Sequence, residues 1–137
     1  MPARTGLAIG DPILKGRASA ACGRLVIDTS PHTLSKDCEA VILPGFFASS
    51  LDGLVERLAT DWFSVLGCFR ELPKETLVAA SCYGTFVLAE SGLLDGQAAT
   101  TTWWFAEAFR NRYPLIHLDA DQALVDGGRT LTAGAMT

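Results

Sequence analysis

The sequence predicts an α/β protein in which a mostly parallel β-sheet is flanked by helices. Short apolar runs at residues 39–43 and 77–80 alternate with stretches whose apolar residues recur at helical spacing, which is typical of βαβ units. The second run stops at residues 81–84, and a helical pattern begins at once. This order of strand, sharp turn and helix is that of a nucleophile elbow. A chain of 137 residues, 49% of them hydrophobic, is long enough for one domain with a core.

The first part of the chain carries little pattern. We expect residues 1–17 to form an arm ahead of an α/β domain at residues 18–137. The apolar residues 7–9 form either a short strand or part of a loosely held arm. Residues 24–27, Arg-Leu-Val-Ile, have the composition of a strand.

The run at residues 39–43 is continuously apolar, so we expect a strand buried on both faces of a parallel sheet. It ends at Pro44-Gly45, where a glycine lets backbone amides approach a ligand. From Leu51 to Phe69, apolar residues recur at steps of three and four. This spacing predicts one long amphipathic helix, or two with a break near Thr60-Asp61.

Past the sharp turn, the sequence predicts one more apolar helix and a series of short elements. Gly92 is placed to end the helix that begins near Thr85. Thr102 is placed as the N-cap of a further helix. The remaining expected elements are a strand at residues 97–101, that helix at 103–111, a strand at 115–118, and a hairpin formed by residues 123–125 and 130–132.

The elbow places Cys82 at the carboxyl end of a strand and near a helix N-terminus. Unpaired amides there carry partial positive charge and favour a thiolate, so Cys82 is the candidate nucleophile if a further group activates it. Ligands of parallel sheets bind beyond the carboxyl ends of strands. Three loops lie there, at residues 44–46, 81–83 and 101–103, and we expect them to converge on one pocket. The candidate ligand-binding residues from these loops are Gly45, Phe46, Cys82, Tyr83, Thr102 and Trp103.

Each candidate also has a purely structural interpretation. Cys82 can be a small buried residue that ends a strand. Tyr83 can simply pack, and Gly45 can be a turn residue. Thr102 can be an N-cap alone, and Trp103 can belong to the core face of its helix.

Composition excludes several classes of partner and cofactor. The net charge is −4 and the eleven basic residues are scattered, so we expect no nucleic acid contact by this chain itself. The four cysteines show no C-x-x-C spacing and no nearby histidine pair, so we expect neither a metal nor another cofactor. No apolar run approaches a membrane span, and the first residues are too weak for a signal peptide. Reduced thiols in the cytoplasm are the simplest interpretation.

The elbow sequence resembles a known superfamily. Residues 81–96, followed by Ala-Thr-Thr-Thr-Trp at 99–103, are similar to the ThiJ/PfpI superfamily, and more closely to the amidase-like N-terminal domain of AraC-family transcriptional regulators. The resemblance covers roughly residues 18–137. It implies a flavodoxin-like fold of the class I glutamine amidotransferase type. Isonitrile hydratases of the superfamily carry a similar elbow, so the resemblance covers both enzymes and sensors.

The chain departs from the family at the position of the histidine. The family has Thr-Thr-His-Trp after the elbow helix, with the histidine facing the cysteine, whereas this sequence has Thr102 there. Threonine does not act as a general base near neutral pH. A Cys–His pair is therefore absent unless His32 or His117 folds towards Cys82.

The ends of the chain also depart from the family. The opening β-α-β segment, which supplies an acidic residue beside the cysteine, is not recognisable, and the chain stops where the family begins its last helix. We therefore expect a partial domain, truncated at both ends. The missing pieces would expose apolar surface, which predicts self-association or an arm-exchanged homodimer.

Three hypotheses about function follow. The first is a non-catalytic domain that senses a small molecule in a pocket over Cys82 and is related to AraC-family transcriptional regulators. The alternative is a cysteine-dependent hydrolase or lyase, similar to an amidase or an isonitrile hydratase. The third is a structural remnant whose pocket is incomplete. Thr102 at the histidine position favours the non-catalytic hypothesis.

Overall fold

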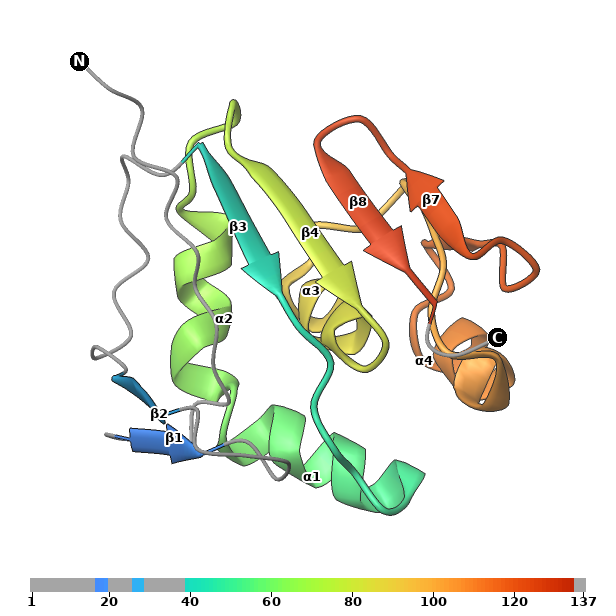
Figure 1. Cartoon of the computed structure of the whole chain (residues 1–137). Helices are drawn as coiled ribbons and strands as arrows, with labels where there is room; N and C mark the ends of the chain where they lie inside the picture. The colour runs from blue at the N-terminus through green and yellow to red at the C-terminus, as the bar shows by residue number, and fades with distance from the viewer. Residues whose placement is uncertain (1–16, 20–25, 29–38, 135–137) are drawn as a thin grey trace.

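A four-stranded sheet forms the centre of the computed structural model, which describes residues 17–19, 26–28 and 39–134 (Figure 1). The strand order is β3-β4-β8-β7. The neighbours β3, β4 and β8 run parallel, and only the hairpin partner β7 is antiparallel. The strands are β3 (Ala40–Leu43), β4 (Leu77–Ser81), β7 (Leu124–Asp126) and β8 (Thr130–Ala133). This architecture confirms the predicted α/β class and the mostly parallel sheet.

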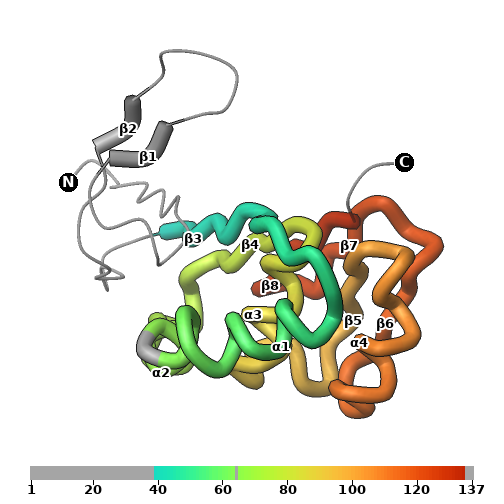
Figure 2. Tube along the Cα trace, turned by 90° about the horizontal axis from the view of Figure 1, so that it is seen from below, coloured from blue at the N-terminus to red at the C-terminus, as the bar shows by residue number. Residues whose placement is uncertain are grey.

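Alternate residues of the sheet point into the core. Val41 and Leu43 of β3, and Val78 and Ala80 of β4, are all at most 4% exposed. The expectation that β3 is buried on both faces is wrong, because Ile42 is 42% exposed. Among the described strands β3 pairs with β4 alone, and Figure 2 shows the helices on one side of the strands. The second face of β3 therefore lacks a covering helix within the described residues.

The long amphipathic stretch folds into two helices, α1 (Leu51–Thr60) and α2 (Phe63–Arg70), with the break next to the predicted position. The Ser50 hydroxyl accepts a hydrogen bond from the Gly53 N–H at 3.1 Å and so caps the start of α1. The Thr60 hydroxyl donates to the carbonyl of Glu56 in the last turn. The buried residues of both helices belong to one hydrophobic cluster with those of β3, β4 and α3.

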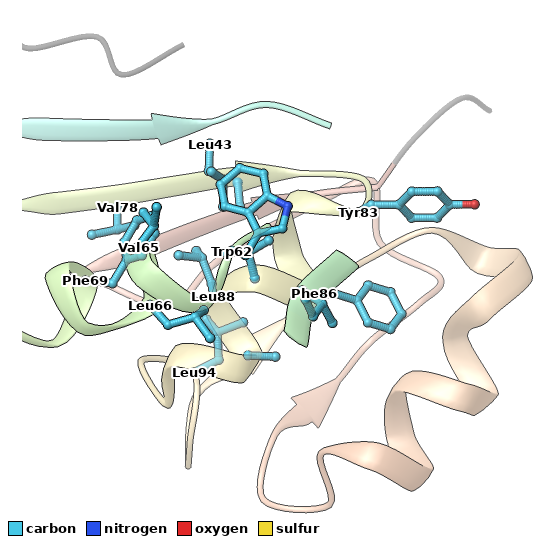
Figure 3. Packing of buried hydrophobic residues seen from close by; sticks show 14 of the residues in the cluster. Leu43, Trp62, Val65, Leu66, Phe69, Val78, Tyr83, Phe86, Leu88 and Leu94 are labelled. Carbon is cyan, nitrogen blue, oxygen red and sulfur yellow. The ribbon is translucent and has the colours of Figure 1, made fainter. Parts of the chain in front are cut away.

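Helix α3 (Gly84–Ser91) is the central helix of the core (Figure 3). Phe86, Val87 and Leu88 on consecutive positions are all fully buried, so α3 is covered on every side. Gly92 ends the helix in the left-handed conformation, with φ +84°, as predicted. The start of α3 packs so closely on β3 that a Cβ on Gly84 would lie 2.7 Å from the Leu43 carbonyl oxygen.

The second half of the domain has shorter elements than the sequence predicts. A parallel pair of two-residue strands, β5 (Ala98–Ala99) and β6 (His117–Leu118), replaces the longer strands expected at residues 97–101 and 115–118. Strand β5 ends at Ala99, because the next N–H, that of Thr100, donates to the Thr132 hydroxyl at 2.8 Å and not to the neighbouring strand. The start of the second expected strand is a turn in which the Ile116 N–H donates to the carbonyl of Tyr113.

The helix expected at residues 103–111 is split. A 3₁₀ turn, η1 (Trp103–Phe105), precedes α4 (Ala106–Arg112). Thr102 is the N-cap residue of η1, the position that the sequence predicts, but its side chain makes no capping hydrogen bond. Its hydroxyl is buried and has no hydrogen-bond partner among the described residues.

Two side-chain networks join distant parts of the domain. The Arg129 guanidinium donates to the carbonyl oxygens of Leu72, Pro73 and Thr76, which links the β7–β8 hairpin to the connection before β4. The Glu90 carboxylate accepts hydrogen bonds from Arg112 and from the Tyr113 hydroxyl, which links α3 to α4. Burial, together with the Glu90 carboxylate, raises the pKa of Tyr113 well above its usual range.

At the N-terminal end, β1 (Arg17–Ser19) pairs antiparallel with β2 (Val26–Asp28). The strand expected at residues 24–27 overlaps β2 in its last two residues. The expectations for residues 1–16, including the apolar stretch at 7–9, lie outside the described residues. The division into an arm at 1–17 and a domain at 18–137 stays a prediction.

Candidate functional site

The sharp turn between β4 and α3 has the geometry of an elbow. Cys82 has φ +53°, and among the described residues no other non-glycine residue has a positive φ. Its N–H donates to the Ala133 carbonyl at 3.0 Å. Its carbonyl oxygen accepts the Thr85 N–H and the Thr101 hydroxyl at 3.2 and 3.1 Å. These contacts from β8, α3 and the segment after β5 hold a conformation that is costly for a side chain with a Cβ.

The loops after β3 and β4 lie directly against each other. A Cβ built on Gly45 would lie 2.9 Å from the Cys82 Cβ and 3.6 Å from its Sγ. Only glycine therefore allows this approach of the backbone to the thiol. The Gly45 N–H, which the sequence suggests as a donor to a ligand oxygen, donates to the Ser81 hydroxyl at 3.1 Å.

The environment of the Cys82 thiol favours its neutral form. Partial burial raises the pKa of this thiol, and a hydrogen bond from the backbone of Tyr83 opposes that rise without cancelling it. Dehydration of the thiolate therefore outweighs the one backbone donor that faces it from the turn before α3. At neutral pH the thiol is expected to be protonated.

An aromatic cluster borders the elbow. Tyr83 is buried, its hydroxyl accepts the Trp104 indole N–H at 2.8 Å, and its ring stacks on Phe105 at a centroid distance of 5.5 Å. On its other side, the half-buried Phe46 ring lies 6.0 Å from Tyr83 and 5.3 Å from Trp62. Figure 3 shows Tyr83 at the margin of the core, with its hydroxyl directed away from the other labelled residues.

The structure brings Gly45 and Phe46 against Cys82 and Tyr83, whereas Thr102 and Trp103 are connected to them only through their chain neighbours Thr101 and Trp104. The accessibility of the six candidate residues differs. Gly45 is exposed, and Phe46 and Cys82 are half-buried. Trp103 is 68% exposed and meets Trp104 edge to face. Thr102 is fully buried, next to the equally buried Thr101.

The sequence does not predict three contributors to the site. The first two are Trp104 and Phe105 of the helix expected at residues 103–111, both of which contact the Tyr83 ring. The aromatic run that directly follows the predicted loop at residues 101–103 is the signal that could have found them. Arg57 is the third, since its guanidinium lies 4.8 Å from the centroid of the Phe46 ring.

Neither histidine is placed beside the thiol within the described part of the chain. His117 is exposed and pairs in register with Ala98, three residues before Thr101 on the neighbouring strand. His32 lies outside the described residues. Over residues 39–134 no three His, Cys, Asp or Glu side chains gather in a group that could hold a metal ion.

A curated protein with a similar sequence is the HTH-type transcriptional regulator CdhR of Pseudomonas aeruginosa. The two are 43% identical over 119 residues, which cover 75% of this chain and 35% of CdhR. The chain therefore spans about a third of the length of that relative. No family model matches the chain.

Solved structures with the same fold include a proposed transcriptional regulator of Vibrio parahaemolyticus. Its TM-score is 0.67 at 23% identity, over 82% of this chain and 57% of that one. A ThiJ/PfpI family protein of Pseudomonas syringae matches with a TM-score of 0.62 at 18% identity, over 94% and 49% of the two chains. An AraC family transcriptional regulator of Pseudomonas putida matches with a TM-score of 0.58 at 15% identity, over 94% and 63%.

These comparisons confirm the resemblance that the elbow sequence suggests. The fold is that of ThiJ/PfpI proteins, and transcriptional regulators are among the similar proteins in both sequence and structure. Among the described residues, no helix is long and apolar enough to cross a membrane.

Proposed function

Because the chain is a ThiJ/PfpI-like domain related in sequence to a transcriptional regulator, we propose that it senses a small molecule and catalyses no reaction. The ligand lies over Cys82, at the meeting of the loops that follow β3, β4 and β5. Any contact with DNA would be made by a part of the regulator other than this chain, whose net charge is −4.

The observation that carries this proposal is an elbow cysteine that has no proton-accepting side chain beside it in the part of the chain that the structure describes. Cys82 keeps the positive φ of an elbow residue, but burial raises the pKa of its thiol. Thr102 stands where the resemblance expects histidine, and its hydroxyl is fully buried. A thiol that stays protonated, with threonine at the position where the resemblance expects histidine, lacks the general base that nucleophilic catalysis needs.

The ligand has specific partners in this proposal. The exposed Gly45 and Trp103, with the half-buried Phe46 and Cys82, offer surface that a small molecule can contact. The backbone amide of Tyr83 faces the thiol and can donate to a carboxylate or carbonyl oxygen. The Gly45 amide joins it only if the ligand oxygen displaces the Ser81 hydroxyl. Thr102 contributes once the neighbouring backbone moves, because it is fully buried.

The test is a screen of small carboxylic acids and amides by thermal shift, followed by a substrate assay. A sensing domain gives a hit that raises the melting temperature, and Cys82→Ser changes its affinity without changing any turnover. Turnover of amides, isonitriles or glyoxals that is lost in Cys82→Ser would overturn the proposal.

A cysteine-dependent hydrolase or lyase remains the alternative, favoured by the φ of +53° at Cys82. Strained conformations persist at reactive residues more often than elsewhere. This alternative requires a substantial thiolate fraction at neutral pH. Alkylation of Cys82 that is already at its plateau rate at pH 7 would support it.

A homodimer in the cytoplasm completes the proposal. Ile42, Leu77 and Leu124, which come from three strands of the sheet, are 39% to 57% exposed and favour self-association through a second copy of the chain. Cys68 and Cys82 form no disulfide, which suits a reducing compartment. Sedimentation velocity tests the dimer: Ile42→Lys should shift the species towards monomer, and a monomeric wild-type chain at tens of micromolar would exclude it.

A further inference from the structure

Besides the hydrogen bond from Gly45 to Ser81, an arginine from α1 holds the loop that lies against Cys82. Residues 44–50 connect β3 to α1 and bring Gly45 against the thiol. The Arg57 Nη1 donates to the Phe47 carbonyl at 2.6 Å. The same guanidinium lies 4.8 Å from the centroid of the Phe46 ring, a distance typical of a cation–π contact.

Asp61 fixes the direction of this arginine. Its Oδ2 accepts from the Arg57 Nε at 2.9 Å, and the two side chains are only 19% and 21% exposed. The guanidinium therefore makes directed contacts on three sides, with a carboxylate, a carbonyl and a ring. Its planar fork suits this combination, whereas the single ammonium of lysine does not.

Burial of the loop's own side chains adds less to its anchoring. Phe47 is 81% exposed and Gly45 has no side chain. Phe46 is the loop residue that joins the aromatic cluster, and it is the one that Arg57 covers. The position of the loop over Cys82 thus depends strongly on Arg57.

We infer that Arg57 is a positioning residue that clamps residues 44–50 over Cys82 and so controls access to the thiol. The inference deepens the proposed function and rests on it only in treating the face around Cys82 as the ligand site. A ligand that contacts Cys82 must then fit beside the clamped loop or displace it.

The test compares iodoacetamide alkylation of Cys82 and Cys68 in one sample, resolved by peptide mass spectrometry. Cys68 on α2 is an internal reference, because it is half-buried but lies outside the loop. Arg57→Ala should raise the rate at Cys82 about tenfold, as expected for easier local opening, and leave the rate at Cys68 unchanged. Asp61→Asn should raise the rate at Cys82 by only about threefold, since the arginine keeps its contacts with the loop.

Further variants separate positioning from general stability. Arg57→Lys should restore part of the protection, because it keeps the charge but not the fork. The matched control is Arg112→Ala, which breaks the other described arginine–carboxylate pair, with Glu90, and should leave Cys82 unchanged. An unchanged Cys82 rate in Arg57→Ala, or an equal rise at Cys68, would overturn the inference.

The alkylation result is independent of whether a ligand is found. If the clamp is present but no compound raises the melting temperature, the proposed function fails and the role of Arg57 stands. If a ligand is found but Arg57→Ala changes neither its affinity nor the Cys82 rate, the clamp fails and the function stands.

Discussion

Hydrogen bonds on both sides of the Cys82 peptide unit hold its backbone in the left-handed region, while its side chain lies against the neighbouring loop. The close contact with this loop, which places the thiol in the site, also removes water from around the thiol. The contacts that position the Cys82 thiol therefore also lower its reactivity. An elbow cysteine becomes a nucleophile only where a base or a cation offsets the loss of hydration.

The pH dependence of Cys82 follows from its burial. Because dehydration raises the pKa of the folded-state thiol, the alkylation rate should reach half its plateau above the ordinary pKa of cysteine. In urea, the midpoint should return to the ordinary value. The free energy of unfolding should also fall as pH rises past the ordinary pKa, because the unfolded chain then loses its proton before the folded chain does. A midpoint at or below the ordinary value would contradict this assignment.

Thr102 gives a second test at the residue scale. Its hydroxyl is buried without a hydrogen-bond partner among the described residues, which is unfavourable. Thr102→Val keeps the shape of the side chain and removes the hydroxyl. The free energy of unfolding should stay constant or rise by about 1 kcal/mol, as measured by urea denaturation. A loss of more than about 1 kcal/mol would mean that the hydroxyl has a partner, such as a buried water.

At the level of elements, the contact between the start of α3 and the end of β3 sets the geometry of the elbow. A Cβ on Gly84 would lie 2.7 Å from the Leu43 carbonyl oxygen and 3.0 Å from that of Pro44. Both acceptors are backbone atoms, which move only with the strand. The glycine after the elbow is thus required by packing, although its own φ is not positive.

Gly84→Ala and Gly67→Ala form a matched pair. Gly84→Ala should lower the free energy of unfolding by about 2 kcal/mol, because the strand or the helix must shift. Gly67 lies on the exposed side of α2, where a Cβ would meet nothing within 4 Å. Gly67→Ala should therefore raise stability by about 0.5–1 kcal/mol through helix propensity. Chemical denaturation of both variants measures the difference; equal effects would refute the packing argument.

The elements that the sequence predicted well are those with strong local signals. The break between α1 and α2, the end of α3 at Gly92 and the β7–β8 hairpin all follow from local spacing and turn residues. The errors arise where distant residues compete for hydrogen bonds. Thr132 takes the N–H of Thr100 and shortens β5, and β3 lies at an edge of the described sheet rather than inside it.

The site could be predicted only in outline for the same reason. The loops that meet at Cys82 follow from the strand order, because parallel strands end at one edge. The burial of Thr102 and the contacts of Arg57 depend on tertiary packing, which spacing does not encode. The i,i+4 spacing of Arg57 and Asp61 reveals their ion pair but not the loop that it holds.

On the scale of the whole molecule, Arg129 connects the β7–β8 hairpin to the segment that precedes β4. Its guanidinium donates to three carbonyl oxygens there, at 3.0 to 3.3 Å. Arg129→Met should lower the free energy of unfolding by about 2 kcal/mol, because those acceptors lose charged donors while the stem still packs. The measurement is urea denaturation at two wavelengths. The control is Arg110→Met, at an exposed position of α4. Equal losses of stability would show that Arg129 has no special role.

The pairing of β4 with β8 has a consequence for how the chain is made. β4 is completed by a strand from far along the sequence, since Val78 pairs with both Val41 and Thr130. The Cys82 N–H likewise needs the carbonyl of Ala133. On the ribosome, α1 and α2 emerge and can form before the codons for β8 are read. Until β8 leaves the exit tunnel, the elbow has no fixed shape. During synthesis, therefore, the thiol is at its most open to oxidation, and a pause between β4 and β8 would prolong that exposure.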